Sequence, residues 1–269
     1  MKRIEETFAA LATKKRKALV AYVCVGDPSV DESIDIALAC VGAGADVLEL
    51  GNPWSDPSAD GPSIARASQR AIASGGGLDG TLRAAREIRK KTQVPIVLFG
   101  YYNPLFVRGD ERVVDDAAEA GIDALLIVDL PLEEGEALRT RAAERGIAVV
   151  PLIAPTSTSS RGNTLKAMGK RAGFIYYVSV TGVTGSASAP LAEASLEAGK
   201  LREITGLPVV VGFGVDTAAK ARAAAEHVDG VVVGTAIVRQ VEDGTSRADR
   251  IHRVETLVRD LRSGLDGQT

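Results

Sequence analysis

Residues 45–62 read ADVLELGNPWSDPSADGP, a short apolar run followed by a loop rich in proline and acidic residues. The run is almost continuously hydrophobic, which is typical of a parallel strand that is covered on both faces. A helical pattern precedes it: Ser29 and Glu32 have the spacing of a capping box that begins a helix, and Gly42 or Gly44 would end that helix. The segment therefore predicts a unit in which a helix leads into a buried strand.

The same unit recurs along the chain. We expect eight strands, at Ala18–Val25, Asp46–Leu50, Pro95–Phe99, Ala124–Val128, Ile147–Ile153, Phe174–Val178, Pro208–Gly212 and Gly230–Val233. Helical patterns lie between them, among them Asp110–Ala120, Glu133–Arg145, Leu191–Ile204 and Thr217–Glu226. Eight strands that alternate with helices predict an α/β fold, a (β/α)8 TIM barrel, as one domain over residues 1–269. Extra helices are expected outside it at Ile4–Arg16 and Arg247–Arg262, and a doubly wound sheet is the alternative.

Composition and charge argue against several classes of protein. The 269 residues include 32 Lys and Arg and 35 Asp and Glu, a net charge of −3, which disfavours a surface for nucleic acid or anionic membranes. No apolar run approaches the roughly 18 residues of a membrane span, and the N-terminus lacks the pattern of a signal peptide. The two cysteines and two histidines are too few for a disulfide framework, a Cys/His zinc site or a Ser-His-Asp triad. We therefore expect a cytoplasmic protein without a bound metal.

Glu49 is the most unusual residue in the expected strands, because a charge inside an apolar strand is costly. Desolvation would raise the pKa of this carboxyl group, which suits a group that donates and accepts protons near neutral pH. A structural carboxylate paired with a cation is the alternative, although no expected strand core contains Lys or Arg. Asp60 lies in the following loop, and the two carboxylates together could perform acid–base steps on one substrate. The missing lysine disfavours a Schiff-base aldolase.

The last two loops predict a phosphate site. Gly212-Phe213-Gly214 and Gly234-Thr235-Ala236 follow the seventh and eighth strands, where barrels often bind phosphate through backbone amides and a short helix. The long loop Thr181–Pro190 could close over a ligand as a lid, or be only a flexible surface loop. Tyr22 and Tyr176, with Phe213, could line an aromatic substrate, although aromatic residues in barrel strands more often fill the core.

The segment around Glu49 resembles the signature of the tryptophan synthase α subunit family. The matching residues are Leu48-Glu49-Leu50-Gly51, Pro53, Ser55-Asp56-Pro57 and Ala59-Asp60-Gly61-Pro62. The similarity continues at Gly26-Asp27-Pro28, Tyr101-Tyr102-Asn103-Pro104, Asp129-Leu130-Pro131, Gly182-Val183-Thr184-Gly185, Gly212-Phe213-Gly214 and Ala236-Ile237-Val238. The resemblance implies a cofactor-free retro-aldol cleavage of indole-3-glycerol phosphate to indole and glyceraldehyde 3-phosphate, in tryptophan biosynthesis.

The resemblance also implies roles for individual residues. Glu49 would protonate the indole carbon that bears the side chain and then help to remove the glycerol hydroxyl proton, while Asp60 would accept the indole N–H. The remaining substrate-binding residues would be Tyr176 beside the catalytic carboxylate, Tyr22, Phe99 and Phe213 around the indole, Thr184 of the lid in contact with Asp60, and Gly185, Gly214, Gly234 and Thr235 at the phosphate.

The family's partner is a pyridoxal-phosphate β subunit, which receives indole through a tunnel in an α2β2 complex. The residues that would face it are Pro53, Trp54, Asp56, Asn103 and Pro104. The chain departs from the family pattern at Cys24, Asn52, Trp54, Ser58 and Thr235. These departures concern partner docking and loop closure and remove no catalytic group.

Three other functions stay open at this point. The chain could be a stand-alone indole-3-glycerol-phosphate lyase, which would perform the same chemistry without obligate channelling. It could be a low-activity allosteric partner of the β subunit, although the presence of both Glu49 and Asp60 argues against that. A more distant alternative is another phosphate-binding barrel, such as a sugar-phosphate isomerase.

Overall fold

One parallel sheet forms the centre of the molecule. The computed structural model describes residues 1–155, 158–178, 191–212 and 214–267, so the expected site residues Thr184, Gly185 and Phe213 lie outside the described part. The strands are β1 (Ala18–Cys24), β2 (Val47–Gly51), β3 (Ile96–Gly100), β4 (Ala124–Ile127), β5 (Ala148–Val149), β6 (Leu152–Ile153), β7 (Ile175–Val178), β8 (Val209–Gly212) and β9 (Gly230–Val233). Their order in the sheet is β5-β4-β3-β2-β1-β9-β8-β7-β6. Each expected strand is therefore present, within one or two residues of its expected ends.

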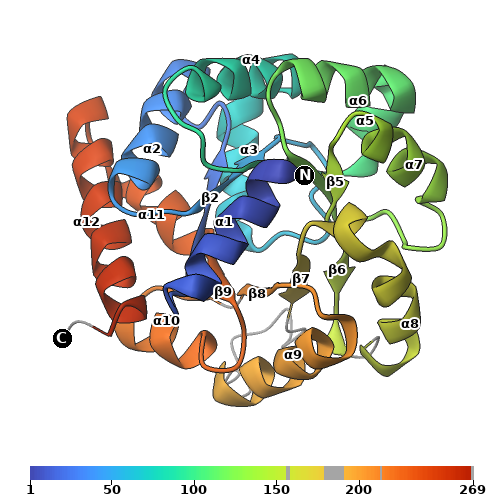
Figure 1. The fold of residues 1–269 in the computed structure, drawn as a ribbon. Helices are drawn as coiled ribbons and strands as arrows, with labels where there is room; N and C mark the ends of the chain where they lie inside the picture. Colours follow the sequence, from blue (N-terminus) through green and yellow to red (C-terminus); the bar gives the residue numbers. More distant parts are fainter. Residues whose placement is uncertain (156–157, 179–190, 213, 268–269) are drawn as a thin grey trace.

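The two ends of this sheet are neighbours in the chain. Only Val150 and Pro151 separate β5 from β6. The N–H of Val150 donates to the carbonyl of Leu125 (2.8 Å), and the N–H of Tyr176 donates to the carbonyl of Pro151 (3.0 Å). The sheet thus curls back on itself (Figure 1). A doubly wound sheet, whose edge strands lie far apart, is inconsistent with this order, and the expected strand Ile147–Ile153 is interrupted where proline supplies no N–H.

Most helices lie on the outside of the curled sheet (Figure 1). They are α1 (Lys2–Thr13), α2 (Val30–Gly42), α3 (Pro62–Ala73), α4 (Leu78–Arg89), α5 (Tyr102–Arg108), α6 (Asp110–Glu119), α7 (Glu136–Glu144), α8 (Thr158–Met168), α9 (Leu191–Thr205), α10 (Ala218–Ala224), α11 (Thr235–Asp243) and α12 (Arg247–Leu265). The predicted start of α2 is confirmed, because the Ser29 hydroxyl accepts the N–H of Glu32 (3.2 Å). The Glu32 carboxylate does not complete the capping box in the way expected, since it accepts a hydrogen bond from Arg250 (3.0 Å). None of the helices in the described residues combines the length and apolar character that crossing a membrane requires.

Helix α1 lies differently from the others. Its apolar side chains Ile4 and Phe8, spaced four residues apart, are buried among the first residues of the strands, and the rings of Phe8 and Phe174 are 5.5 Å apart. The helix therefore covers the end of the sheet where the strands begin, whereas the sequence pattern predicted a helix on the outer face. The opposite end of the sheet, where the strands finish, is left for the site.

Alternation along the strands places the functional side chains. In β2, Leu48 and Leu50 pack against the helices, while Val47 belongs to the inner cluster. Glu49 shares the face of Val47, because successive side chains of a strand point to opposite faces. Both faces are buried, which explains why the expected strands read as continuous apolar runs.

Candidate active site

Four inward-facing side chains gather near the end of the sheet where the strands finish. They are Tyr22 of β1, Glu49 of β2, Phe99 of β3 and Tyr176 of β7. Tyr22 lies opposite Glu49 in the strand register, and its ring meets that of Phe99 edge to face, with centroids 5.3 Å apart. Burial raises the pKa of Tyr176, and the charges of Glu49 and Asp60 add to this rise, so Tyr176 lies within reach of both carboxylates. The structure thus brings together a buried acid and an aromatic lining.

Glu49 has no charge partner among the described residues. Its side chain is 1% exposed, and neither carboxyl oxygen has a hydrogen-bond partner there. Burial raises the pKa of Glu49 to about 8. The expected rise in pKa is confirmed, and the paired structural carboxylate is not found. A carboxyl group with this pKa is largely protonated at neutral pH and can give and take a proton.

Asp60 lies in the loop between β2 and α3 and is partly buried. A turn holds it in place, in which the N–H of Asp60 donates to the carbonyl of Pro57 (3.0 Å). Burial raises the pKa of Asp60 to about 6, and a hydrogen bond from Tyr101 acts in the opposite direction. Asp60 is therefore ionised in most molecules at neutral pH, when Glu49 is protonated. This difference suits an acid and a base that act on one substrate.

Tyr101 is a residue of this site to which the sequence analysis gave no role, although it belongs to one of the matching motifs. It follows β3 directly and is 3% exposed, and its hydroxyl oxygen accepts the N–H of Ala59 (3.0 Å). The available signal was its position, because residues directly after the strands of a barrel commonly reach the site. A tyrosine in an apolar segment gave no further hint of its contact with Asp60.

Two glycines at strand ends make room for the tyrosines. A Cβ added to Gly51 would lie 2.3 Å from the Tyr22 hydroxyl oxygen, and one added to Gly212 would lie 2.4 Å from that of Tyr176. Both distances are far below van der Waals contact, so larger residues would displace the rings. Gly51 and Gly212 therefore help to shape the site by leaving space for these two rings.

The expected phosphate residues Gly234 and Thr235 lie where β9 passes into α11. Gly234 precedes the first residue of α11, and no side chain caps this helix start. Open N–H groups at a helix start favour an anion. Gly234 also borders the aromatic lining, because a Cβ added to it would lie 3.6 Å from the Tyr22 side chain. Gly214 is exposed and has a φ of +45°, a conformation that favours glycine.

A cluster of ion pairs joins the segments that surround this site. Arg70 of α3 binds Asp27 with two hydrogen bonds (2.9 and 2.8 Å) and also donates to Glu242 of α11 (3.0 Å). Arg66 binds the same Glu242 with two hydrogen bonds of 2.9 Å, which hold the pKa of Glu242 at about 2. Asp27 is 3% exposed, so its pairing with Arg70 is well shielded from water. The cluster fixes the helix after Asp60 to the helix after Gly234.

The residues expected to face a partner differ in their exposure. Pro53 is buried, Trp54 and Pro104 are partly buried, and Asp56 and Asn103 are exposed. The structure adds two apolar side chains that the sequence did not indicate. Phe106 and Val107 of α5 are 64% and 78% exposed. Helix α5 is held at its start, where the N–H of Tyr102 donates to Asp129 (2.7 Å).

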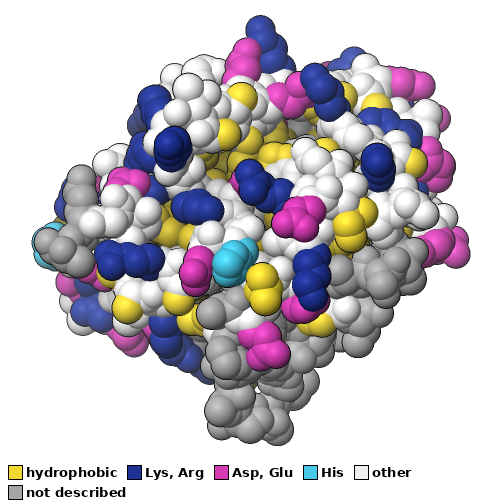
Figure 2. Space-filling model, turned by 60° about the horizontal axis from the view of Figure 1, so that its bottom comes forward, with side chains coloured by type: hydrophobic (Ala, Val, Ile, Leu, Met, Phe, Trp, Pro, Cys, Tyr) yellow, Lys and Arg dark blue, Asp and Glu magenta, His cyan; other side chains and the backbone are white. Residues whose placement is uncertain are grey.

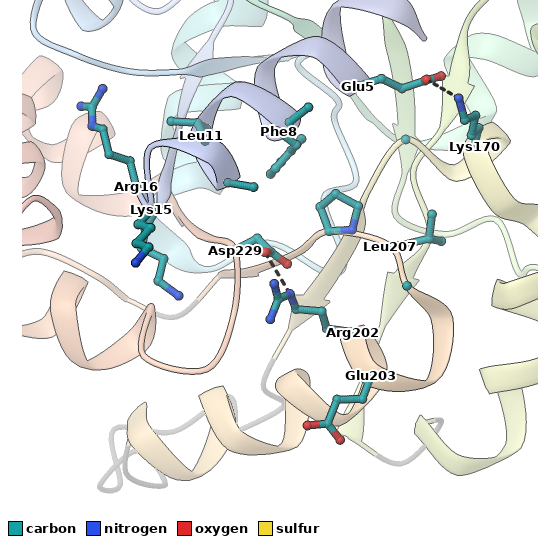
Figure 3. A pocket seen from close by; sticks show the side chains of 16 residues that line it. Glu5, Phe8, Leu11, Lys15, Arg16, Lys170, Arg202, Glu203, Leu207 and Asp229 are labelled. Carbon is teal, nitrogen blue, oxygen red and sulfur yellow. Dashed lines mark hydrogen bonds and ion pairs between the residues drawn. The ribbon is translucent and has the colours of Figure 1, made fainter.

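A hollow of about 840 Å³ lies at the other end of the sheet, under α1 (Figure 3). Phe8 of α1 forms one side, and Asp229, which directly precedes β9, lies on the other. Arg202 pairs with Asp229 (3.0 Å), and Lys170 pairs with Glu5 (2.8 Å). Because strands begin at this end, the hollow is separate from the site of Glu49.

No metal site is evident in the part of the chain that the structure describes, since it holds no group of three or more His, Cys, Asp or Glu residues that could bind an ion. On the face shown in Figure 2, basic and acidic side chains are interspersed. The buried carboxylate, its aromatic lining and the open helix start remain the features to be explained.

Comparisons with known proteins give a consistent result. A family model described as "Tryptophan synthase alpha chain" matches residues 8–266. A tryptophan synthase alpha chain from Geotalea daltonii is 46% identical over 266 residues, covering 98% of this chain and 99% of the relative. A solved structure of tryptophan synthase subunit alpha from Legionella pneumophila has a TM-score of 0.90 at 33% identity, covering 98% of each chain. A structure of tryptophan synthase from M. tuberculosis in an aminoacrylate-bound form has a TM-score of 0.85 at 31% identity, covering 98% of this chain and 99% of that one.

Proposed function

The chain belongs to the tryptophan synthase α chain family, and from this premise we propose that Glu49 and Asp60 carry out its reaction. The reaction is the lyase cleavage of indole-3-glycerol phosphate in tryptophan biosynthesis, which gives indole and glyceraldehyde 3-phosphate. The observation that carries the assignment is the burial of Glu49 without a partner, since an unpaired buried acid is costly and needs a reason.

The steps follow from the protonation states of the two carboxyl groups. Glu49, protonated at neutral pH, donates its proton to the indole carbon that bears the side chain, while Asp60 accepts the indole N–H and stabilises the positive charge on the ring. The Glu49 carboxylate then removes the proton of the adjacent glycerol hydroxyl. The carbon–carbon bond breaks as the aldehyde forms, and the electron pair returns to the ring. Glu49 ends the cycle protonated, so no external acid or base is consumed.

The aromatic lining and the phosphate end complete the site. Tyr22 and Phe99, in edge-to-face contact, would border the indole, and Tyr176 would lie beside Glu49. Gly234 and Thr235 at the start of α11, with Gly214, would receive the phosphate. Thr184 and Gly185 belong to this proposal on the family resemblance, and Phe213 belongs to it because of its position after the seventh expected strand.

Glu49→Gln tests the assignment most directly, because glutamine keeps the shape and cannot transfer the proton. Indole formation should fall by about 10²–10⁴-fold, the usual contribution of one general acid–base group, while binding of a phosphorylated ligand persists. The control is Glu87→Gln on α4, which removes a carboxylate paired with Lys90 on the surface. Normal turnover in Glu49→Gln would return Glu49 to a structural role.

Asp60→Asn tests the second carboxylate, because an amide cannot take the indole N–H proton. Most of the activity should be lost. A large loss of substrate binding with unchanged turnover would instead make Asp60 a residue that only positions the indole.

We further propose that the curled sheet is a closed (β/α)8 barrel in which β5 and β6 are two halves of one strand. Residues 1–269 would form one domain, with α1 and α12 as additions to the eight repeated units. The adjacency of β5 and β6 in the chain supports the closure.

The enzyme itself would use no cofactor, and we place it in the cytoplasm because its reaction belongs to amino-acid biosynthesis.

The partner would be a pyridoxal-phosphate β subunit in an α2β2 complex. Trp54, Asp56, Asn103 and Pro104 would lie at the interface, with buried Pro53 shaping the loop. Exposed Phe106 and Val107 favour this assembly over a stand-alone lyase, since a monomer gains nothing from such a patch. The mass of the complex with a β subunit, measured by sedimentation, tests the stoichiometry, and the rate of indole release with and without β tests the stand-alone function.

A further inference from the structure

We propose that Glu242 of α11 is a positioning residue, which sets the separation between Asp60 and the phosphate end of the site. It acts through its ion pairs with Arg66 and Arg70 of α3. The proposal rests on the function proposed above, in which Asp60 meets the indole and the start of α11 receives the phosphate. It goes beyond that function by assigning a role to a residue at the opposite end of α11 from the phosphate.

The two helices begin side by side. Helix α3 begins two residues after Asp60, and α11 begins directly after Gly234. A Cβ added to Gly234 would lie 3.7 Å from the Cδ1 atom of Ile64, in the first turn of α3. A substrate that reaches both Asp60 and the start of α11 therefore depends on how these two helix starts lie relative to each other.

The apolar packing between α3 and α11 interlocks the helices only weakly. The buried residues there are Ala67 and Ala71 of α3 and Val238 of α11, which belong to one cluster with Tyr22. Large side chains of one helix that fit between those of the next resist sliding, whereas alanine presents only a methyl group. The position of α11 along α3 therefore needs a further constraint.

The ion pairs of Glu242 supply this constraint. Its two carboxylate oxygens accept hydrogen bonds from Nε and Nη2 of Arg66, both at 2.9 Å. The same carboxylate accepts a third hydrogen bond from Nη1 of Arg70, at 3.0 Å. A single ion pair on a surface contributes little, but a two-point arginine–carboxylate contact within a network of charges fixes the geometry of both partners.

Arg70 is itself fixed to the loop after β1. It donates two hydrogen bonds (2.9 and 2.8 Å) to Asp27, whose side chain is 3% exposed. The hydroxyl of Ser74, directly after α3, donates to the carbonyl of Gly26 in the same loop (2.6 Å). Helix α3 is thus held at the end of β1, and Glu242 joins α11 to this fixed helix.

Glu242→Gln separates the two helices with little other damage. Its side chain is 27% exposed, and Arg70 keeps its two hydrogen bonds to Asp27. Replacing Arg70 would instead leave the buried charge of Asp27 without a partner, which is costly for folding. Arg66→Gln is the second variant, because it removes two of the three hydrogen bonds to Glu242 from a side chain that is 51% exposed.

The matched control is Glu255→Gln on α12. The Glu255 side chain is 29% exposed, close to the exposure of Glu242, and it also accepts a hydrogen bond from an arginine, Arg259 (2.9 Å). That pair lies within one helix and joins no two elements. Glu255→Gln should therefore keep the wild-type kinetics.

The experiment compares two substrates, indole-3-glycerol phosphate and indole-3-glycerol, which lacks the phosphate, after circular dichroism has confirmed that the variants fold. In Glu242→Gln we expect kcat/KM for the phosphorylated substrate to fall about tenfold or more, because small displacements of reacting groups are costly. The value for indole-3-glycerol should stay at that of the wild type, since a substrate held at one end can follow a small shift. Arg66→Gln should act in the same direction, and the double variant should be no slower than Glu242→Gln, because both substitutions break one contact.

Two results would overturn the proposal. One is a wild-type kcat/KM for the phosphorylated substrate in Glu242→Gln, and the other is an equal or larger loss with indole-3-glycerol, which would show general damage to the fold. If Glu242→Gln fails to fold, the same two outcomes are read from Arg66→Gln.

Asp60→Asn and Gly234→Ala are measured alongside, so that the proposals can fail separately. Full activity in Asp60→Asn, or an unchanged KM for the phosphorylated substrate in Gly234→Ala, would refute the function proposed for that end of the site. If both variants behave as expected and Glu242→Gln is unaffected, only the role of Glu242 is wrong.

Discussion

Tyr22 and Gly51 occupy adjoining space at the ends of β1 and β2: a Cβ added to Gly51 would lie 2.3 Å from the Tyr22 hydroxyl oxygen and 2.5 Å from the ring carbon that bears it. The absence of a side chain at Gly51 therefore allows the ring of Tyr22 to lie where it meets Phe99 edge to face. The shape of the expected indole pocket depends on a residue that need not touch the indole.

Gly51→Ala should displace Tyr22 and impair substrate binding. Overpacking of this kind costs about 1–3 kcal/mol of stability, and we expect KM for indole-3-glycerol phosphate to rise. Gly42→Ala is the control, because a Cβ there meets nothing within 4 Å. Unchanged KM in Gly51→Ala would show that Tyr22 does not border the substrate.

Gly234→Ala tests the phosphate end. The added Cβ would make only ordinary contacts, 3.6 Å from Tyr22 and 3.7 Å from Ile64, so the fold should tolerate it. Because it narrows the approach to the start of α11, we expect a higher KM for the phosphorylated substrate and little change in the affinity for free indole. Gly77→Ala, which alters the glycine before α4 without a contact within 4 Å, controls for the loss of a helix-capping glycine. Equal effects on both ligands would contradict a phosphate site at Gly234.

The buried Glu49 should make stability depend on pH. Its pKa is about 8 in the folded chain and near the ordinary value of 4.5 when unfolded, so the folded state binds more protons between these values. The free energy of unfolding of the wild type should therefore fall as pH rises from 4.5 to 8, relative to that of Glu49→Gln, which does not titrate. The difference between the unfolding free energies of the two proteins should change by an amount on the order of several kcal/mol over this range and stay constant above it. Urea unfolding at several pH values measures it, and a gap that does not change with pH would be inconsistent with a protonated buried carboxyl group.

Trp54 should report the approach of a β subunit, because it is the single tryptophan of the chain and is partly buried in the loop that carries Asp60. Docking should shift its emission to the blue and protect it from a soluble quencher, once the signal of the β subunit is subtracted. Trp54→Ala should weaken association while most of the basal lyase activity remains. If the emission maximum of the isolated chain is already at short wavelength, and a saturating concentration of the β subunit does not move it, then Trp54 packs against its own chain and not against the partner.

Phe106→Ala should also weaken binding of the β subunit, because Phe106 is an exposed aromatic side chain of the kind that anchors interfaces. We expect about a tenfold or greater rise in Kd, measured by titration calorimetry. Leu196→Ala on α9 removes another exposed apolar side chain, 49% exposed, and should have no effect. Equal affinities in the two variants would remove α5 from the interface.

Much of the fold could be predicted because its signals are local. Each strand is a short apolar run, and Ser29 marks the start of α2 through its own hydrogen bond to Glu32. Pro151 was visible in the sequence as well, and its missing N–H accounts for the division of one expected strand into β5 and β6. Helix α5 was missed because Tyr102–Arg108 is too short to show a helical period.

The site could be predicted only where one residue contradicts its surroundings. Glu49 is such a residue, a charge in an apolar strand. Tyr101 is not, because a tyrosine after a strand is unremarkable until its contact with Ala59 is known. The pairing of Arg70 with Asp27 and Glu242 joins positions 43 and 172 residues apart, and no local pattern connects them.

The interruption at Pro151 determines where the sheet is easiest to open. Five aligned residue pairs join β1 to β2, whereas two join β4 to β5 and two join β6 to β7. We call the β4–β5 and β6–β7 pairings the seam of the sheet. Backbone amides of the seam should exchange with solvent deuterium faster than those of β1 and β2, because fewer hydrogen bonds between strands must break there. Tyr176 lies on the β7 side of the seam, opposite Leu152. One of the two joins with the fewest aligned pairs therefore involves the strand that carries Tyr176, a residue of the expected site.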